Sequence, residues 1–282
     1  MKSKSKLVII ISVIVLILAL IITLVVIDNN MVEINSYSVL TGKLPSGFEM
    51  KIAQISDFHN CKLKNETVSQ IREAKPDIIV ITGDLIDSRK TNVERSMELI
   101  NEITKIAPCY YVSGNHEARI KDTYESLKEQ MIEGGVIVLE NESITLEAQG
   151  AKINLIGLSD PKFALPKGKD NELKSEIKER LSELVNPELY NLVLCHRPEA
   201  FKEYVSQGAD LIFTGHAHGG QIILPLFGGI IAPNQGLFPK YYKGIYNEEN
   251  TTMAVSRGIG NSLFPFRMFN RPEVLMVELK GE

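Results

Sequence analysis

Residues 50–59, MKIAQISDFH, carry the pattern that decides the fold of this 282-residue chain. A short apolar run, Met50 to Ile55, is followed at once by Asp57 and His59, two side chains that bind metals. A run of this length is typical of a buried strand. The same arrangement, an apolar run followed by Asp, Asn or His, returns at four later places in the chain.

The four later segments are IIVITGD at 78–84, CYYVSGNHE at 109–117, LVLCH at 192–196 and LIFTGHAH at 211–218. All five histidines of the chain lie in these segments or in the first one. In an α/β sheet, groups at the carboxyl ends of neighbouring strands converge on one crevice. We therefore expect five separate strands to direct their polar side chains at one point.

Short apolar runs alternate with amphipathic segments from Glu49 onward, which indicates a layered α/β domain. Thr91-Asn92-Val93-Glu94 is typical of a capping box and predicts a helix toward Ile106, stopped before Pro108. A second helix is predicted from Glu172 to Val185, with its leucines on one stripe. The predicted strands are 50–55, 77–81, 109–112, 136–139, 153–158, 192–195, 211–214, 253–256 and 274–279.

The N-terminus differs from the rest, because Leu7 to Ile27 is an apolar run long enough to span a bilayer. Lysines at 2, 4 and 6 precede it, and Asp28 and Glu33 follow it, so the positive-inside bias predicts a cytoplasmic N-terminus and an extracytoplasmic domain. The alternative is a cleaved signal peptide, against which stand the length of the run and its exit, which lacks small residues. The expected division is 1–6 cytoplasmic, 7–27 transmembrane anchor, 28–47 connector and 48–282 catalytic domain.

The charge and cysteine composition of the chain limits which molecules it can bind and which disulfides it can form. With 31 basic and 35 acidic residues the net charge is -4, and the sequence has no basic stripe to neutralise a nucleic-acid backbone. We therefore expect no nucleic acid as partner, and the sequence leaves the oligomeric state open. Three cysteines, Cys61, Cys109 and Cys195, cannot form a complete disulfide set and are interpreted as small buried hydrophobes.

The polar residues of the five segments indicate a metal site. Carboxylate, imidazole and amide oxygen together suit divalent Zn, Mn or Fe. Asp57-x-His59 and His216-x-His218 would each place two side chains on one side of extended backbone. Seven ligands exceed one tetrahedral site, which predicts two ions about 3.5 to 4 Å apart that share a carboxylate. The seven are Asp57, His59, Asp84, Asn115, His196, His216 and His218.

The order Asp-x-His, Gly-Asp, Gly-Asn-His-Glu, His, Gly-His-x-His, from Ile52 to His218, resembles the calcineurin-like metallophosphoesterase superfamily. The stretch His218-Gly-Gly-Gln221, with Arg267 and Arg271-Pro272-Glu273, is similar more narrowly to bacterial membrane-associated phosphodiesterases of the YkuE and YaeI type. The resemblance implies a two-sheet β-sandwich flanked by helices, an αββα fold with both metals at the strand ends. It also implies two ligand sets: Asp57, His59, Asp84 and His218 for the first metal, and Asp84, Asn115, His196 and His216 for the second.

These residues predict hydrolysis of a phosphoester or pyrophosphate bond. A hydroxide between the ions would attack phosphorus in line, because two cations lower the pKa of water. His116, next to the ligand Asn115, is predicted to donate a proton to the leaving oxygen or to stabilise the transition state. Glu117 is expected to orient His116, and Asp87 to support the ligands from behind. For both carboxylates the alternative is local capping.

Arg197, Arg257 and Arg267 are weaker candidates for phosphate contacts, since a guanidinium matches phosphate oxygens in a fork. Surface salt bridging is the alternative for each. The apolar, glycine-rich stretch from Ile222 to Tyr246 is expected either to cover the core or to wall a cleft for the tail of a lipid-linked substrate. A soluble phosphorylated small molecule remains the other substrate class, and a non-catalytic metal-binding envelope protein the other function.

Overall fold

Strand β3, Ile78–Thr82, explains why the apolar runs of this chain are continuous. All five of its residues are buried. Alternate residues of a strand point to opposite faces: Val80 lies in the core between the two sheets, whereas Ile79 and Ile81 lie in the core beneath helices. A strand covered on both faces needs apolar residues at every position.

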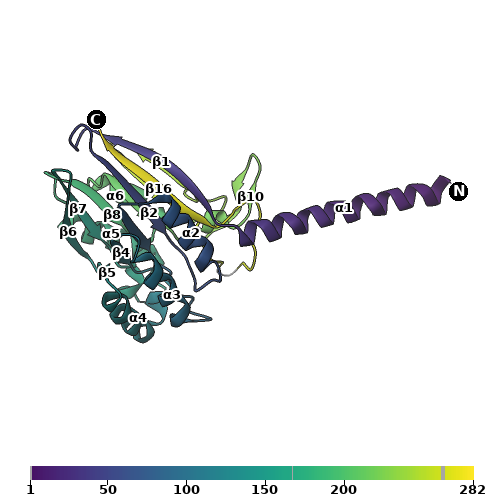
Figure 1. Cartoon of the computed structure of the whole chain (residues 1–282), viewed down its shortest axis with the longest axis horizontal. Helices are drawn as coiled ribbons and strands as arrows, with labels where there is room; N and C mark the ends of the chain where they lie inside the picture. The colour runs from purple at the N-terminus through teal and green to yellow at the C-terminus, as the bar shows by residue number, and fades with distance from the viewer. Residues whose placement is uncertain (1, 167, 262–263) are drawn as a thin grey trace.

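The computed structural model describes residues 2–166, 168–261 and 264–282; Met1, which belongs to the expected segment 1–6, lies outside this description, as do the side chains of residues 2–5. Two six-stranded sheets stack face to face (Figure 1). The first has the order β1 (Glu33–Thr41), β16 (Glu273–Gly281), β2 (Glu49–Ile55), β3, β4 (Cys109–Val112) and β5 (Val136–Val138). The second has the order β14 (Gly244–Glu248), β15 (Thr251–Val255), β9 (Leu211–Thr214), β8 (Tyr190–Leu194), β7 (Ala151–Gly157) and β6 (Glu142–Ala148).

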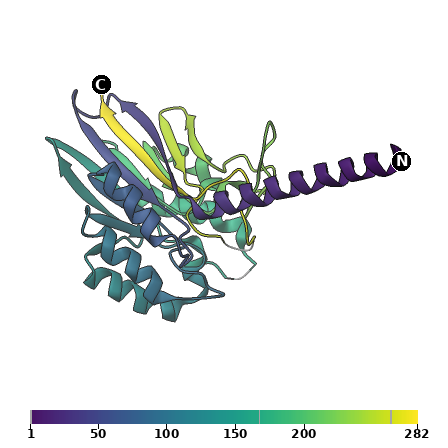
Figure 2. The same ribbon diagram turned by 45° about the vertical axis from the view of Figure 1, so that its right-hand side comes forward.

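Helices cover the outer face of each sheet, which gives four layers (Figure 2). The first sheet packs against α2 (Lys64–Ala74), α3 (Val93–Ile103) and α4 (Lys121–Glu133); the second packs against α5 (Leu173–Leu184) and α6 (Phe201–Ser206). Between the sheets, residues such as Val112, Leu192 and Phe213 form the central core. The predicted two-sheet sandwich flanked by helices is therefore confirmed.

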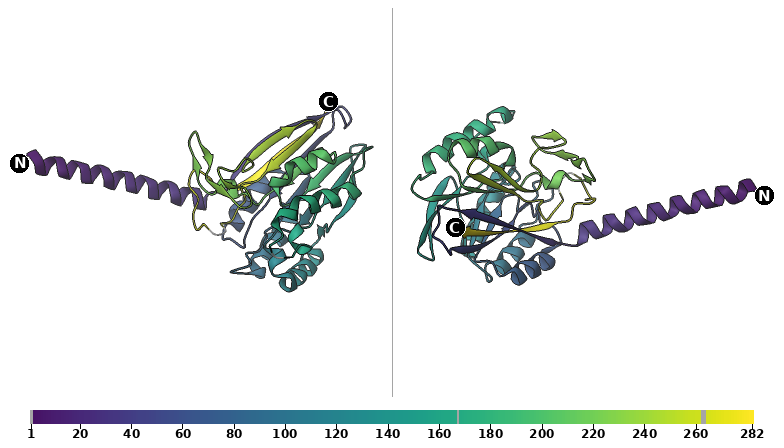
Figure 3. Two further views of the ribbon diagram at one scale, coloured as in Figure 1. Left: turned by 180° about the vertical axis from the view of Figure 1, so that it is seen from behind. Right: turned by 90° about the horizontal axis from the view of Figure 1, so that it is seen from above.

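Helix α1, Lys2–Asn30, projects away from the domain (Figure 3). Within its stretch Lys6–Asn30, an 18-residue window has a mean hydropathy of 3.5, and the stretch is long and apolar enough to cross a membrane. Beside the base of α1 lie two small hairpins, β10 (Ile223–Leu224) with β11 (Gly228–Gly229), and β12 (Ile231–Ala232) with β13 (Gly236–Leu237).

Three local expectations need correction. Residues 28–47, expected to be a connector, contain strand β1, which pairs in parallel with β16 along its whole length. The predicted capping box is wrong in its first residue: Asn92, not Thr91, caps α3 and accepts the Arg95 N–H at 2.9 Å, while the Thr91 hydroxyl donates to the Asp87 carbonyl. Helix α3 also ends at Ile103, before the predicted Ile106.

The central strands of both sheets run parallel, and this places the polar segments together. Strands β2, β3 and β4 are parallel neighbours in one sheet, as are β8 and β9 in the other. Gln54 links the sheets at this end, because its side-chain amide donates to the Thr214 carbonyl and the Thr82 hydroxyl, both at 2.8 Å. All five polar segments therefore begin at one edge of the sandwich.

Candidate metal centre

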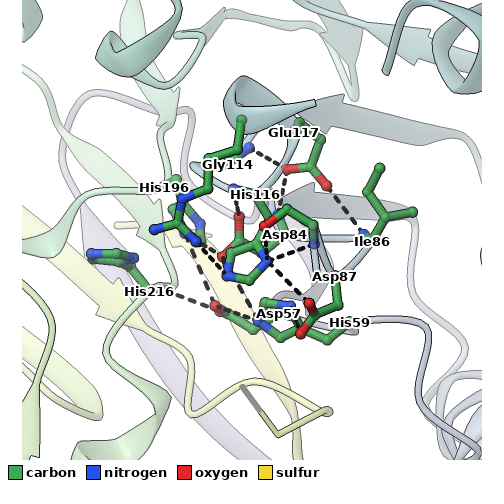
Figure 4. A network of polar contacts seen from close by, with 12 residues as sticks. Asp57, His59, Asp84, Ile86, Asp87, Gly114, His116, Glu117, His196 and His216 are labelled. Atoms are coloured by element: carbon green, nitrogen blue, oxygen red, sulfur yellow. Dashed lines mark hydrogen bonds and ion pairs between the residues drawn. The ribbon is translucent and has the colours of Figure 1, made fainter. Parts of the chain in front are cut away.

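Buried carboxylates and imidazoles from the five segments meet at this edge (Figure 4). Their atoms fall into three overlapping groups in which candidate ligand atoms lie within 4.8 Å of one another. The groups are Asp57, His59 and His218; His59, Asp84 and His116; and Asp84, His196 and His216. The structure thus brings together side chains that the sequence separates by up to 161 positions, from Asp57 to His218.

The first group surrounds a point between β2 and the segment after β9. His59 Nε2 lies 3.3 Å from His218 Nε2. Asp57 Oδ1 lies 3.2 Å from His218 Nε2 and 3.8 Å from His59 Nε2. Burial raises the pKa of Asp57, but His218 and His196 outweigh burial and hold it below its usual value. One carboxylate oxygen and two imidazole nitrogens, which are potential metal ligands, therefore face one another in a buried space.

Asp84 connects this group with the next. Its Oδ2 lies 3.7 Å from His59 Nε2 and 3.3 Å from His196 Nε2. The orientation of His196 is fixed from behind, because its Nδ1 lies 2.7 Å from the Thr82 carbonyl and donates to it. That bond leaves Nε2 directed at Asp84. Burial lowers the pKa of His196, but the charge of Asp84 outweighs burial and raises it to about 10, so that a proton or a cation is held between the two atoms. One carboxylate oxygen thus lies between the two groups, as the sequence predicts for a bridging ligand.

Asn115 and His216 complete the second group. His216 Nε2 lies 2.8 Å from an Arg197 nitrogen, which can only donate, and 3.0 Å from Asn234 Oδ1, which accepts from the tautomer protonated at Nε2, so Nδ1 carries or lacks the proton according to the tautomer. One end of the Asn115 amide lies 2.8 Å from that Nδ1, and its nitrogen donates there in the orientation that hydrogen bonding favours. A half-turn of the amide presents its oxygen instead. Asn115 and His216 therefore adapt to either a proton or a cation between them.

The backbone at the centre is strained. Asp57, His59, Asp84, His216 and His218 all have positive φ values between 48° and 65°. Residues with a side chain seldom adopt this left-handed conformation, and such outliers cluster at functional sites. The expectation that Asp57-x-His59 and His216-x-His218 lie on extended backbone is therefore wrong: both pairs lie on tight turns just past the strand ends.

Two glycines allow these turns to approach one another. A Cβ at Gly215 would lie 1.8 Å from Ser56 Oγ and 2.4 Å from Asp57 Oδ2. At Gly114 it would lie 2.3 Å from Asp84 Oδ1. Both distances are far below a van der Waals contact, so only glycine fits at either position. The glycines beside the ligands thus let one ligand-bearing loop touch the next.

Glu117 holds the loop of Asp84 in place and does not orient His116. Its fully buried carboxylate accepts three backbone N–H groups, from Asp84 at 2.9 Å, Ile86 at 3.1 Å and Gly114 at 2.8 Å. Burial and the nearby Asp84 carboxylate raise the pKa of Glu117 to about 7. The expectation that Glu117 orients His116 is therefore wrong, because its carboxylate is engaged by the backbone on either side of the ligand Asp84.

His116 is oriented by Ser88 instead. Its Nδ1 accepts the Ser88 backbone N–H at 3.0 Å, so the neutral ring carries its proton on Nε2. Nε2 lies 3.9 Å from Asp84 Oδ2 and 3.2 Å from a guanidinium nitrogen of Arg119. Asp87 lies behind the centre, with Oδ2 4.0 Å from His59 Nδ1. Burial lowers the pKa of His116, which favours the neutral ring.

The arginines proposed for phosphate contact are buried and engaged. Arg197 forms a fork with Asp160, with nitrogen–oxygen distances of 2.6 and 3.0 Å, and its third nitrogen reaches Asn234 and His216. Arg267 donates to the carbonyls of Arg257 and Gly260 and to Asn261. Arg257 pairs with Glu273 and Glu33. As described, none of the three offers a nitrogen to a substrate, because burial and partners hold each in the framework.

Several residues around the centre were not predicted from the sequence. Arg119 follows His116 by three positions on a short 3₁₀ turn, Glu117–Arg119, and this spacing was the available signal. Asn234 comes from the β12–β13 hairpin, far from any ligand in sequence. Beside His59, a groove of about 640 Å³ is lined by Arg89, Lys90 and Arg95 among others. These cations give one side of the centre a positive rim.

The oxygen and nitrogen atoms that meet at the centre are suited to bind cations. Within the described part of the chain, Asp57 Oδ1 and His196 Nε2 are buried and lack a well-aligned hydrogen bond. Buried polar atoms in proteins are nearly always satisfied, and bare carboxylate and imidazole atoms that face one another repel. Imidazole, carboxylate and amide oxygen are the ligands of divalent transition metals. A cation in each group would satisfy these atoms together.

Comparisons with known proteins point the same way. The sequence model of the calcineurin-like phosphoesterase family matches residues 50–220. The chain is 32% identical over 267 residues to the metallophosphoesterase YkuE of Bacillus subtilis, covering 90% of this chain and 88% of the relative. It is 27% identical to the phosphodiesterase YaeI of Escherichia coli, covering 81% and 82%.

Among solved structures, the chain is similar to the phosphopantetheinyl hydrolase PptH of Mycobacterium tuberculosis. The two share a TM-score of 0.50 and 12% identity, with 73% of this chain and 88% of the other covered. At this identity the likeness concerns the fold alone.

We predict that Glu117→Ala destabilises the protein. The change leaves three buried N–H groups without their acceptor, and each unsatisfied donor costs about 1–3 kcal/mol. Urea unfolding of the full chain in detergent should therefore show a loss of more than about 3 kcal/mol. Glu102→Ala removes an exposed carboxylate from α3 and serves as the control, with little change expected. An unaltered unfolding midpoint for Glu117→Ala would contradict the role given to Glu117.

Proposed function

This chain belongs to the calcineurin-like phosphoesterase family and is a phosphoester hydrolase, and on that premise we propose that it is a two-metal phosphodiesterase acting on an envelope or lipid-linked substrate. The observation that carries the proposal is the meeting of six carboxylate and imidazole ligands, with Asn115 beside His216, from five strand ends in one buried region. Members of this family use two divalent metals. Mn, Zn and Fe suit the nitrogen and oxygen donors found here.

Each ion would be held by residues from both sheets. Asp57, His59 and His218 would hold the first, and Asn115, His196 and His216 the second, with Asp84 shared. When bound, the two cations lower the pKa of water and neutralise charge that develops on phosphate. Thr82 would fix the orientation of the His196 ring, and Arg197 and Asn234 that of the His216 ring, so that His196 Nε2 and His216 Nδ1 point at the ion.

His116 would stabilise the leaving group. Its Nδ1 is occupied by the Ser88 N–H, so its one proton lies on Nε2, the atom that faces Asp84 and Arg119. From there the neutral ring can donate a hydrogen bond to a leaving oxygen at phosphorus and stabilise the negative charge that develops on it. The exposed Arg119 guanidinium, 3.2 Å from Nε2, adds positive charge beside that oxygen.

The setting of the centre supports a lipid-linked substrate. A cavity of about 540 Å³ adjoins His218 and is lined on its other sides largely by apolar groups, including Ile231, Pro233 and Phe264. The positive groove reaches the centre at His59. An amphiphilic phosphodiester would place its tail in the first and its polar part in the second. Helix α1 would hold this centre at a membrane, with the N-terminal lysines in the cytoplasm and the domain outside.

The alternative is a non-catalytic protein that binds the metals for structure or sensing. Structural sites are usually closed. Here a groove reaches His59 and a cavity reaches His218. A substrate could therefore reach the centre through the groove or the cavity, which favours catalysis.

We predict that the full chain in detergent, supplied with Mn²⁺, hydrolyses a chromogenic phosphodiester and contains two ions per molecule by elemental analysis. Asp84→Asn should lose both properties, because Asp84 Oδ2 lies between the two ligand groups. Asp122→Asn removes an exposed carboxylate of α4 and should keep both. Two bound ions without turnover on any phosphoester would favour the non-catalytic alternative.

We predict that His116→Ala lowers kcat by about 10²–10³ while both metals remain bound, since one positioned hydrogen-bond donor to developing charge contributes that much. Ser88→Ala is the matched control: it removes the hydroxyl 3.2 Å from Nδ1 but keeps the backbone N–H that orients the ring. Its effect on kcat should be small. Undiminished turnover of His116→Ala with two metals would remove His116 from the mechanism.

We predict that a lipid-linked phosphodiester is hydrolysed with a higher kcat/KM than its soluble headgroup. Ile231→Glu places a charge in the apolar cavity and should raise KM for the lipid-linked substrate more than for the headgroup. Ile137→Glu, on the remote strand β5, is the control. Equal kcat/KM for the two substrates would rule out the tail cavity without touching the hydrolytic function.

A further inference from the structure

Exposed large hydrophobic side chains outside α1 gather in two segments. Leu226, Phe227, Leu237 and Phe238 belong to the two small hairpins, and Phe266 and Phe269 to the loop before β16. Leu226 is fully exposed and Phe227 is 71% exposed. Elsewhere in the described domain, after Met31 at the end of α1, such residues occur singly, as at Leu40, Ile132 and Ile137. We call Leu226, Phe227, Leu237, Phe238, Phe266 and Phe269 the apolar collar.

The two parts of the collar form one unit. The Ile223 N–H donates to the Met268 carbonyl at 3.0 Å, and Ile222 forms a bridge with Met268. Asn270, next to Phe269, donates to the carbonyls of His218 and Gln221 at 2.8 and 3.0 Å. The hairpins and the loop are therefore fastened together beside the metal centre.

The collar is also fastened to α1. Asn29 accepts the Arg267 N–H at 2.9 Å and donates to the Arg267 carbonyl at 3.0 Å. Asp28 accepts the Phe269 N–H and pairs with Arg271. Because a helix rises 1.5 Å per residue, Ile27, the last residue of the apolar run, lies within about 3 Å along the axis of these contacts. Figures 1 and 3 show the β10 hairpin beside the base of α1.

We propose that the apolar collar is a second membrane-contacting surface, which inserts into the lipid interface around the base of α1. The occupant follows from α1: a bilayer that contains Leu7 to Ile27 ends at the level of the loop that α1 holds. Exposed apolar clusters of this kind mark interaction sites, and aromatic side chains suit the membrane interface. This proposal does not depend on the reaction.

The collar also sets where the metal centre opens. The apolar cavity beside His218 is lined by Ile231 and Phe264, which lie in the same two segments as the collar. With the collar in the interface, the cavity opens onto lipid, whereas the groove at Arg89 and Lys90 reaches the centre at His59.

The chain contains no tryptophan, so single tryptophans report on each position without background. The full chain would be reconstituted into phosphatidylcholine vesicles with and without brominated acyl chains, which quench tryptophan on contact. Phe227→Trp and Leu237→Trp test the collar. Ile14→Trp in α1 is the positive reference, and Ile137→Trp, an exposed apolar position on β5, is the matched control.

We expect Phe227→Trp and Leu237→Trp to shift their emission to shorter wavelength and to lose intensity in brominated vesicles, as Ile14→Trp does, while Ile137→Trp does neither. Adding Phe227→Glu to Leu237→Trp should reduce the quenching. If Ile14→Trp is quenched while either collar tryptophan is not, the proposal is overturned. A blue shift without lipid quenching would also overturn it, because a second copy of the chain would then cover the collar.

Discussion

Two carboxylates buried within reach of five imidazoles are the constraint on which the rest of this structure depends. Asp57 and Asp84 are almost inaccessible to solvent, and burial of a charge without a partner is among the most costly events in folding. Hydrogen bonds from the Ser56 hydroxyl and from the backbone N–H groups of His116 and His216 satisfy part of each carboxylate. The remaining oxygens face imidazole nitrogens, and compensation there requires protons or cations.

The sandwich keeps this arrangement in place by spreading it over both sheets. Each sheet supplies strand ends, and a hydrogen bond such as that from His196 to Thr82 crosses from one sheet to the other. The left-handed turns at the ligands are unfavourable locally, so they persist only because the surrounding core over-determines them. Gly114 and Gly215 then remove the atoms that would keep the loops apart. Stability resides in the strands, and strain resides in the loops that carry the chemistry.

The sequence predicted the central strands of both sheets and the convergence of the seven ligand positions well, because continuous apolar runs and the residues that follow them are local patterns. It failed where a partner is distant in the chain. Nothing near Glu117 signals that its carboxylate binds the backbone N–H groups of Asp84 and Ile86. Asn234 was invisible for the same reason. Strand β1 was missed because its neighbour β16 lies at the opposite end of the sequence.

That pairing of β1 with β16 constrains biosynthesis. Strand β16 lies between β1 and β2 in the sheet, so a strand that is synthesised after the other described strands must fit between two that are synthesised early. Until β16 is made, the nascent chain has a gap in the middle of one sheet, with two bare strand edges. Non-local pairing of this kind is slow, and uncovered edges invite aggregation. Any premature stop before Glu273 therefore leaves a product with an open sheet.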